Sequence, residues 1–275
     1  MRRLWERVAV YGGAAVTVFV CAFPLLWMLS TSLKPFAEVL AWPPYLIPRR
    51  PTLSNFQRLF SETNFLTYFK NSMICAWAAT ILSIGVGSIG GYSLTRYRYP
   101  GRQQVALGTL LTYMFPPIVL IIPFFMVFRK FGLVESYAGL ILAYTAFSLP
   151  FSTWMLRAFF QSIPLDLEEA ALVDGANRLR AVAHIVVPLA LPGVIAVSIF
   201  TFIVAWNDYL FARVLTASEE LKTLPLGVQD FFTMAVIDWG IIMAAGMMIT
   251  IPALIFFVLV QRHLVSGWGA GAVKG

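Results

Sequence analysis

The sequence predicts an all-α integral membrane protein with six transmembrane helices and a charged hairpin of two short helices between the fourth and the fifth. Apolar and aromatic residues make up 59% of the 275 residues, and charged residues only 12%. A water-soluble domain of this length exposes far more charge. Long apolar stretches therefore account for the composition, in agreement with the mean hydropathy of +0.79.

Six runs are long enough to cross the membrane, which takes about 20 helical residues at a rise of about 1.5 Å each. The first follows Arg2, Arg3 and Arg7. It is longer than the core of a signal peptide and has no small-residue cleavage site, so we expect it to remain as an anchor. The predicted spans, within a single domain covering residues 1–275, are residues 8–30, 72–95, 105–128, 137–160, 189–211 and 239–260.

The second span contains the pattern G-x-G-x-x-G at residues 85–90. In soluble proteins this pattern marks a dinucleotide site after a strand, but here it lies inside an apolar run and no acidic residue follows about twenty positions later. Gly87 and Gly91 instead have the small-x-x-x-small spacing that lets two helices approach closely in lipid. We therefore expect helix packing at these glycines.

Each interior proline removes a backbone hydrogen bond and leaves a carbonyl to be satisfied elsewhere, and the kinked helices that result suit a pathway that opens and closes. The alternative, which we favour for any single proline, is that proline is simply commoner in membrane helices than in soluble ones. The prolines occur within or at the ends of the spans, at Pro24, Pro116, Pro117, Pro123, Pro150, Pro192 and Pro252.

Residues 161–188, between the fourth and fifth spans, concentrate four carboxylates, two arginines and a histidine in a segment that cannot lie in lipid. Asp166 and Glu169 have the spacing of a capping box, in which two side chains satisfy backbone N–H groups at a helix start. The first helix of the hairpin is therefore expected to begin just after Pro164.

Three residues predict the rest of the hairpin. Gly175 supplies the left-handed stop of the first helix, because glycine adopts positive φ without a steric cost. Asn177 is a suitable cap for a second helix. Pro188 is expected to end that helix, since proline disfavours an α conformation in the residue before it.

The spacing in this hairpin resembles the EAA loop of bacterial ABC importer permeases. The matching residues are Glu169-Ala170-Ala171, Gly175, Ile185 and Val187-Pro188, with Val187 where the family usually has Leu. In that family the loop docks into a groove of the ATP-binding subunit. The resemblance therefore implies a type I ABC importer permease fold with a cytoplasmic coupling hairpin; an ordinary amphipathic hairpin that caps the bundle is the alternative. The residues it assigns to ATPase coupling are Glu168, Glu169, Ala170, Ala171, Asp174, Gly175, Ile185 and Pro188.

Three softer matches are similar to the carbohydrate branch of this family, typified by the shorter, six-span subunit of the maltose permease. They are Ser32-Leu33-Lys34-Pro35, Ala205-Trp206-Asn207-Asp208 and the tail Gly269–Gly275. The resemblance implies a non-catalytic sugar-transport subunit that pairs with a second homologous permease and binds two copies of an ATP-binding subunit. An extracytoplasmic solute-binding protein would deliver the carbohydrate. Di- or oligosaccharides, polyols and glycerol phosphodiesters all stay open as substrates.

The chain has no phosphate-binding loop, so we expect it to bind no cofactor and the partner ATPase to bind ATP and Mg²⁺. Six crossings put both termini on the same side as the hairpin. Lysine and arginine occur in loops on both sides, so the positive-inside rule alone does not decide the orientation. The basic N-terminus and the resemblance of the hairpin favour cytoplasmic termini, in the bacterial inner membrane.

Asn207, Asp208 and Tyr209 lie towards the outer end of the fifth span. A carboxylate costs about 2.5–3.5 kcal/mol at the bilayer centre but much less near the interface. These three residues are candidates for the transport pathway, including contact with the substrate, or for an interfacial aromatic belt with its hydrogen-bond partners.

Two segments are expected to contact partner proteins because of the resemblance. In the outer loop Arg213–Asp238, the turn Leu224-Pro225-Leu226-Gly227 is a candidate contact with the solute-binding protein. The glycine-rich tail Ser266–Gly275 suits a flexible end on composition alone. By resemblance it reaches between the two ATPase subunits.

Other classes of function have little support. The two histidines, His184 and His263, have no companion at metal-ligand spacing, so no metal site is expected. Cys21 and Cys75 fall inside apolar runs and are expected to be small buried hydrophobes. The net charge of +7 suits loops against anionic membrane lipid and does not indicate nucleic acid, because no basic run accompanies it.

The rival function is an ion-coupled secondary carrier that acts without an ATPase. Such carriers usually show inverted repeats and ionisable groups near the bilayer midplane, and the spans hold almost no central acid or base. A structural membrane scaffold is a third alternative, which the coupling hairpin disfavours.

Overall fold

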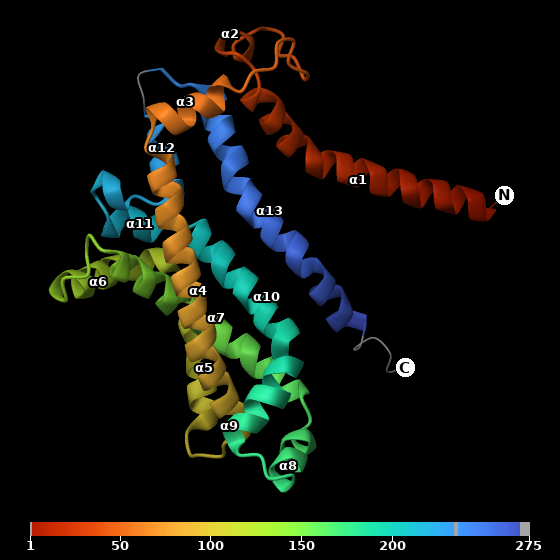
Figure 1. Cartoon of the computed structure of the whole chain (residues 1–275), viewed down its shortest axis with the longest axis vertical. Helices are drawn as coiled ribbons and strands as arrows, with labels where there is room; N and C mark the ends of the chain where they lie inside the picture. The colour runs from red at the N-terminus through yellow and green to blue at the C-terminus, as the bar shows by residue number, and fades with distance from the viewer. Residues whose placement is uncertain (1, 234–235, 270–275) are drawn as a thin grey trace. The chain divides into compact units, whose positions relative to one another are not determined.

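The computed structural model describes residues 2–233 and 236–269, and every regular element within these ranges is helical (Figure 1). Among the described residues, five helices are long and apolar enough to cross a membrane, and a bent pair makes a sixth crossing. The predicted six-span, all-α class is thus confirmed when the bent pair counts as one span. Contacts divide the chain into two compact units: residues up to Leu66 with 227–252, and residues 67–226 with those from Ala253 onward.

The first unit is held together by the buried side chain of Asn55. Its amide Nδ2 donates hydrogen bonds to the carbonyls of Ser32 (2.9 Å) and Lys34 (2.8 Å), which lie at and after the end of α1. A Cβ atom on Gly240 would lie 2.6 Å from the Asn55 Oδ1 atom, so any side chain there would displace the Asn55 amide. The unit contains α1 (Arg2–Ser32), α2 (Phe36–Val39), α3 (Ser54–Glu62), the end of α12 (Leu224–Asp230) and the first part of α13 (Trp239–Gly269).

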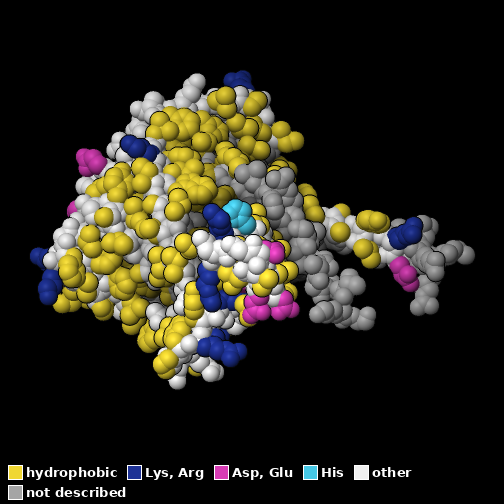
Figure 2. All heavy atoms as spheres, turned by 60° about the horizontal axis from the view of Figure 1, so that its bottom comes forward, with side chains coloured by type: hydrophobic (Ala, Val, Ile, Leu, Met, Phe, Trp, Pro, Cys, Tyr) yellow, Lys and Arg dark blue, Asp and Glu magenta, His cyan; other side chains and the backbone are white. Residues whose placement is uncertain are grey.

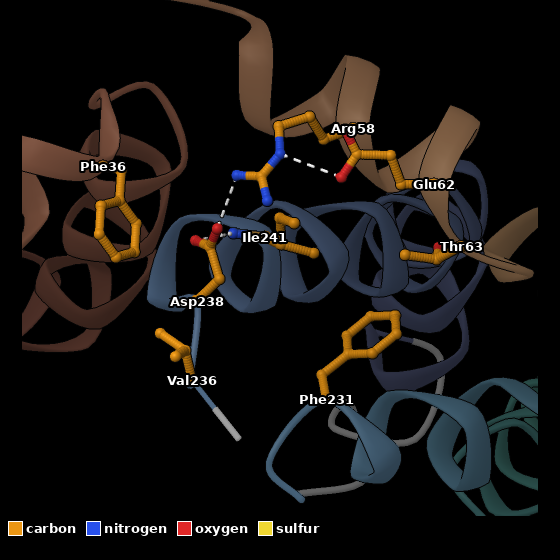
Figure 3. A pocket seen from close by; sticks show the side chains of 8 residues that line it. All are labelled: Phe36, Arg58, Glu62, Thr63, Phe231, Val236, Asp238 and Ile241. Atoms are coloured by element: carbon orange, nitrogen blue, oxygen red, sulfur yellow. Dashed lines mark hydrogen bonds and ion pairs between the residues drawn. The ribbon is translucent and has the colours of Figure 1, made fainter. Parts of the chain in front are cut away.

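A cavity of about 390 Å³ in the first unit surrounds an ion pair between α3 and the start of α13 (Figure 3). Arg58 contacts Asp238 at 2.6 Å and Glu62 at 3.2 Å. The other oxygen of Asp238 accepts hydrogen bonds from the backbone N–H groups of Gly240 and Ile241, which caps α13. The pair therefore fixes where α13 begins.

The first span corresponds to Val10–Ser32 of α1, and none of its most apolar window is buried within the chain. Cys21, which lies in this span, is exposed, so the prediction that it is buried was wrong; Cys75 is buried as predicted. An apolar run shows only that its residues avoid water. In a membrane protein such a residue can contact lipid or a partner subunit instead of the core, because lipid tails are equally apolar.

The second unit is the larger helical bundle and carries the charged hairpin at one end (Figure 1). Its long helices form where the sequence has long apolar runs. Helix α7 begins at Tyr137, where the fourth span was predicted to begin. In the first unit, α13 likewise begins at Trp239, the predicted start of the sixth span. The helices of the second unit are α4 (Phe65–Arg96), α5 (Arg102–Tyr113), α6 (Pro117–Lys130), α7 (Tyr137–Ser162), α8 (Leu165–Val173), α9 (Arg178–Ala181), the π-helix η1 (Val182–Val186), α10 (Val187–Trp206), α11 (Leu210–Leu215) and the 3₁₀-helix η2 (Glu219–Leu221).

The glycines of the second span pack against α7, which confirms the predicted helix packing. A Cβ atom on Gly87 would lie 3.2 Å from the Ser152 Cβ atom. A Cβ atom on Gly91 would lie 2.9 Å from the Arg157 backbone nitrogen and 3.1 Å from the Thr153 carbonyl oxygen. The backbones of α4 and α7 approach this closely because neither glycine has a side chain.

The third span is not the single run 105–128 that the sequence predicts. It is broken into α5 and α6, which bend by 101° (Figure 1). Pro116 caps α6 with an extended backbone and Pro117 is its first residue. Neither proline has an N–H group, so α5 cannot continue its hydrogen-bond ladder through them.

The segment after α11 is bonded to α4. The Asn71 side-chain amide donates to the carbonyls of Glu220 (2.7 Å) and Lys222 (2.9 Å), and the Leu224 N–H donates to the Ser72 hydroxyl at 2.7 Å. The turn predicted at 224–227 was wrong, because these residues open α12, where proline is accepted in the first turn. Contact of Leu224, Pro225, Leu226 and Gly227 with a binding protein stays a prediction, and Leu224 and Leu226 are themselves buried.

The C-terminal tail is only partly described. Helix α13 continues to Gly269, so Ser266–Gly269 are helical and do not belong to an unfolded end. Residues 270–275 lie outside the described residues.

Candidate functional site

The first helix of the charged hairpin, α8, begins immediately after Pro164, as predicted. The capping box was wrong: Pro164 occupies the N-cap position, no side chain caps the helix, and Asp166 lies in the first turn. Proline's extended backbone directs the chain into the helix, and the carboxylates of Asp166 and Glu168 complement the positive end of the helix dipole.

Gly175 ends α8 in the left-handed conformation, with φ of +88°, as predicted. The N–H of Ala176 donates to the Ala171 carbonyl at 2.9 Å, and the N–H of Gly175 donates to the Leu172 carbonyl at 3.2 Å. These two bonds form a Schellman motif, which satisfies carbonyls at the end of a helix. The bend of the hairpin is therefore fixed by its backbone.

Asn177 caps α9 as predicted, since its Oδ1 atom accepts a hydrogen bond from the Arg180 N–H at 2.9 Å. The prediction that Pro188 ends this helix was wrong. The chain passes from α9 through η1 into α10, with Pro188 in the first turn of α10. In η1 the Val187 N–H bonds to the Val182 carbonyl, five residues back. This wider turn accommodates a residue that has no N–H group to donate.

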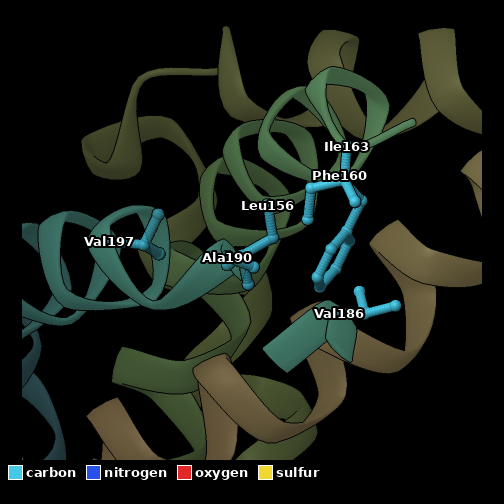
Figure 4. Packing of buried hydrophobic residues seen from close by; sticks show 6 residues of the cluster. All are labelled: Leu156, Phe160, Ile163, Val186, Ala190 and Val197. Atoms are coloured by element: carbon cyan, nitrogen blue, oxygen red, sulfur yellow. The ribbon is translucent and has the colours of Figure 1, made fainter. Parts of the chain in front are cut away.

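A buried apolar cluster supports both ends of the hairpin (Figure 4). Ile163 comes from the α7–α8 connection and Val186 from the end of η1. Both pack with Leu156 and Phe160 at the end of α7 and with Ala190 of α10. Because the hairpin enters and leaves through one packed cluster, the two spans hold its base in place.

Two adjacent glutamates of α8 have opposite environments. Glu168 is buried, and its Oε1 atom accepts a hydrogen bond from the Arg96 Nε at 2.5 Å while its Oε2 accepts one from the Tyr92 hydroxyl at 2.8 Å. Glu169 is exposed. Arg96 and Tyr92 were not predicted as partners of Glu168, although their i, i+4 spacing puts both on one face of the second span.

The outer surface of the hairpin is both apolar and charged. Val173 is 87% exposed and Leu179 is 81% exposed, although both are large apolar residues. Over this end of the second unit, Figure 2 shows acidic and basic side chains gathered among hydrophobic ones. Exposed apolar residues beside charges are typical of a surface that binds another protein.

A cavity of about 140 Å³ opens beside α8. Glu169 and Arg178 line it, and Leu165 and Leu172 supply apolar walls. The rest of the lining comes from Ala181 and from the bonded residues Tyr92, Arg96 and Glu168. Four other residues that the resemblance assigns to coupling lie on the hairpin and are at least partly accessible to solvent: Ala170, Ala171, Asp174 and Ile185. The structure thus brings the predicted coupling residues together on one hairpin, with Glu168 turned inward.

The second predicted site lies where the fifth span ends. Helix α10 stops at Trp206, so the predicted end at Phe211 was wrong. The Asn207 side chain donates to the Ile203 carbonyl at 2.9 Å, and the Asp208 carboxylate accepts from the N–H groups of Phe211 and Ala212, both at 3.1 Å. Such side-chain bonds to the backbone compete with helix continuation.

Asn207, Asp208 and Tyr209 line a cavity of about 340 Å³ with Tyr144 and Phe147 of α7. Asp208 is half-buried, and its flanking residues are exposed. Their place in a transport pathway stays a prediction, since the carboxylate of Asp208 already has a structural partner in α11.

We expect Asp208→Ala to lower the free energy of unfolding by about 0.5–2 kcal/mol, the usual cost of losing a helix cap. Asp208→Asn is the matched variant, because asparagine caps equally well without the charge. We expect it to unfold and transport like the wild type, measured by thermal unfolding in detergent and by uptake. An Asn variant that is stable but inactive would show that the charge contacts the substrate.

The chain matches the family described as "Binding-protein-dependent transport system inner membrane component" over residues 83–269. It is 36% identical to the inner membrane ABC transporter permease protein YcjP of Escherichia coli, over 100% of this chain and 99% of the relative. It is also 35% identical to the trehalose/maltose transport system permease protein MalG of Thermococcus litoralis, with 98% of each chain covered.

Its fold is similar to a chain in the crystal structure of a bacterial ABC transporter that imports alginate, an acidic polysaccharide. The TM-score is 0.81 at 25% sequence identity, over 94% of this chain and 96% of that chain. These similarities favour an ATP-driven system over an ion-coupled carrier. They run along the whole length of this chain, and the chain belongs to the family of binding-protein-dependent transport system inner membrane components.

Proposed function

We propose that this chain is the permease subunit of an ATP-driven carbohydrate importer and that its hairpin, residues 161–188, docks on the ATP-binding subunit. The exposed surface of the hairpin carries this proposal. Val173 and Leu179 present large apolar side chains to solvent, and Glu169 stands beside a cavity large enough for one side chain. Anchoring of large side chains in small pockets is the usual source of affinity in protein interfaces.

A carbohydrate substrate is supported by full-length similarity to proteins of that class. The Thermococcus litoralis relative is named for trehalose and maltose, and the transporter of similar fold imports alginate. All three are carbohydrates: trehalose and maltose are neutral, and alginate is acidic. A sugar therefore fits this chain better than an amino acid or a metal ion.

The proposed partners are supported by the family to which the chain belongs and by surfaces that are not buried within the chain. A second homologous permease would complete the pathway, a solute-binding protein would deliver the sugar, and two copies of the ATPase would bind ATP and Mg²⁺. The unburied α1 span supports a partner permease or lipid at that helix. A hairpin on the ATPase side supports cytoplasmic termini, because six crossings would return both ends of the chain to that side.

The test is reconstitution of the permease pair, the ATPase and the solute-binding protein in lipid vesicles. We expect trehalose, maltose or another di- or oligosaccharide to bind the solute-binding protein and to stimulate ATP hydrolysis and uptake. Methionine serves as the non-sugar control and should do neither. Stimulation by methionine alone would contradict the carbohydrate assignment, and uptake without ATP would contradict the ATP-driven mechanism.

A further inference from the structure

We propose that Glu168 is a positioning residue that locks the coupling hairpin to span α4, together with Arg96 and Tyr92. In this assignment the two adjacent glutamates have separate tasks: Glu169 faces the ATPase, and Glu168 transmits the movement of α8 to a membrane-spanning helix. The inference rests on the proposed function, because it concerns how the docked hairpin passes on its motion.

The geometry shows a complete connection between α8 and α4. Both carboxylate oxygens of Glu168 are used, one by Arg96 at 2.5 Å and one by Tyr92 at 2.8 Å. A second guanidinium nitrogen of Arg96 donates to the Ile163 carbonyl at 2.9 Å. One guanidinium therefore holds both the first turn of α8 and the connection from α7. A planar group with several fixed donors suits this role, and lysine does not.

The burial of these side chains makes the connection specific. The side chains of Arg96 and Glu168 are each only 7% exposed. Inside a protein an ionic hydrogen bond is stronger than in water, and removing one partner leaves an uncompensated buried charge. Neither side chain is accessible enough to serve as an ordinary surface contact for the ATPase.

Aromatic packing holds Tyr92 in its bonding orientation. Its ring makes edge contacts with Phe160, at a centroid distance of 6.0 Å, and with Tyr97, at 6.2 Å. The Arg178 guanidinium of α9 lies over the Tyr97 ring at 5.3 Å. The cluster therefore links both helices of the hairpin to the cytoplasmic end of α4.

Without this cluster, α8 would be free to pivot at Ile163 and Pro164, where the backbone of both residues is extended or non-helical. Movement of α8 would then bend the α7–α8 connection at Ile163 and Pro164, and α4 would not move with it. With the cluster intact, α8 and α4 move as one body. Hydrogen-bonded networks between rigid helices are a physical means of such coupling.

The test uses the complete transporter complex with spin labels at two exposed positions, Leu167→Cys in α8 and Ile89→Cys in α4, after replacement of Cys21 and Cys75. The distance distribution between the labels is measured by pulsed electron paramagnetic resonance, without nucleotide and with ATP plus orthovanadate. In the otherwise native protein we expect one narrow distribution in both states.

Glu168→Gln should broaden this distribution while the ATPase subunits stay bound. Glu169→Gln is the matched control, and we expect the reverse: a narrow distribution and several-fold weaker ATPase retention. A pair that only stabilised the fold would reduce the yield of complex and leave the distribution narrow. That outcome, or loss of ATPase retention in Glu168→Gln as large as in Glu169→Gln, would overturn the proposal.

The double variant Arg96→Met, Glu168→Leu provides a second test if the single variant does not fold. Apolar replacement of a buried ion pair often preserves folding but removes the directional bonds. We expect a broadened distribution, and a narrow one would show that the bonds are not needed. If the distributions behave as expected but Glu169→Gln retains the ATPase fully, the docking function fails and the positioning role stands.

Discussion

Glu169→Lys is expected to abolish transport while the protein still inserts in the membrane. The Glu169 side chain is exposed and takes no part in the hydrogen bonds from Arg96 and Tyr92 to Glu168, so the substitution removes none of those bonds. It reverses a charge at the surface that we assign to ATPase docking, where like charges oppose binding. The affinity for the ATPase should fall tenfold for each ~1.4 kcal/mol of lost binding energy. The loss is measured by co-purification of the ATPase and by uptake into vesicles.

Gly175→Pro should have the same effect for a backbone reason. Proline fixes φ near −65°, whereas Gly175 has φ of +88° and donates its N–H to the Leu172 carbonyl. Gly175→Asn is the matched control, since asparagine adopts the left-handed conformation more readily than other residues. We expect it to keep most of the activity. Wild-type uptake in both Glu169→Lys and Gly175→Pro would refute the coupling role of the hairpin.

Gly91→Leu is expected to prevent α4 from packing on α7. Even a Cβ atom at this position would lie 2.9 Å from the backbone nitrogen of Arg157, and backbone atoms cannot move aside as a flexible side chain does. Overpacking of a close interface costs about 1–3 kcal/mol and occasionally more. We therefore expect a large loss of folded protein, measured by thermal unfolding and by the yield of monodisperse protein in detergent.

Gly85→Leu is the matched control on the same helix. A Cβ atom on Gly85 meets nothing within 4 Å, so the same substitution six residues earlier should leave the isolated chain folded. Equal destabilisation by both variants would mean that glycine acts through helix flexibility and not through the close contact with α7.

The sequence by itself determined the number of spans and the place of the hairpin. Both depend on local properties, because an apolar run of sufficient length must be helical in lipid and a cluster of carboxylates must leave it. The positive φ at Gly175 and the cap at Asn177 were predictable for the same reason. Each follows from what one residue does to its own backbone.

The break of the third span and the passage of α10 through Pro188 were decided by neighbouring structure. Proline predicts a disturbance, but it does not specify a 101° bend at Pro116–Pro117 or a π-turn before Pro188. A missing N–H group is compatible with a helix end, a kink or a wider turn. The packing of the adjoining helices selects among these.

Only the tertiary structure decided which glutamate of the hairpin faces inward. Glu168 and Glu169 are chemically identical neighbours, and no local pattern separates them. Their side chains point in different directions because successive residues of an α-helix are about 100° apart. The partner that selects Glu168 is Arg96, which is 72 residues earlier in the chain and reaches α8 because α4 ends beside it. A contact at that separation depends on how the spans pack, which the sequence pattern of either segment alone does not contain.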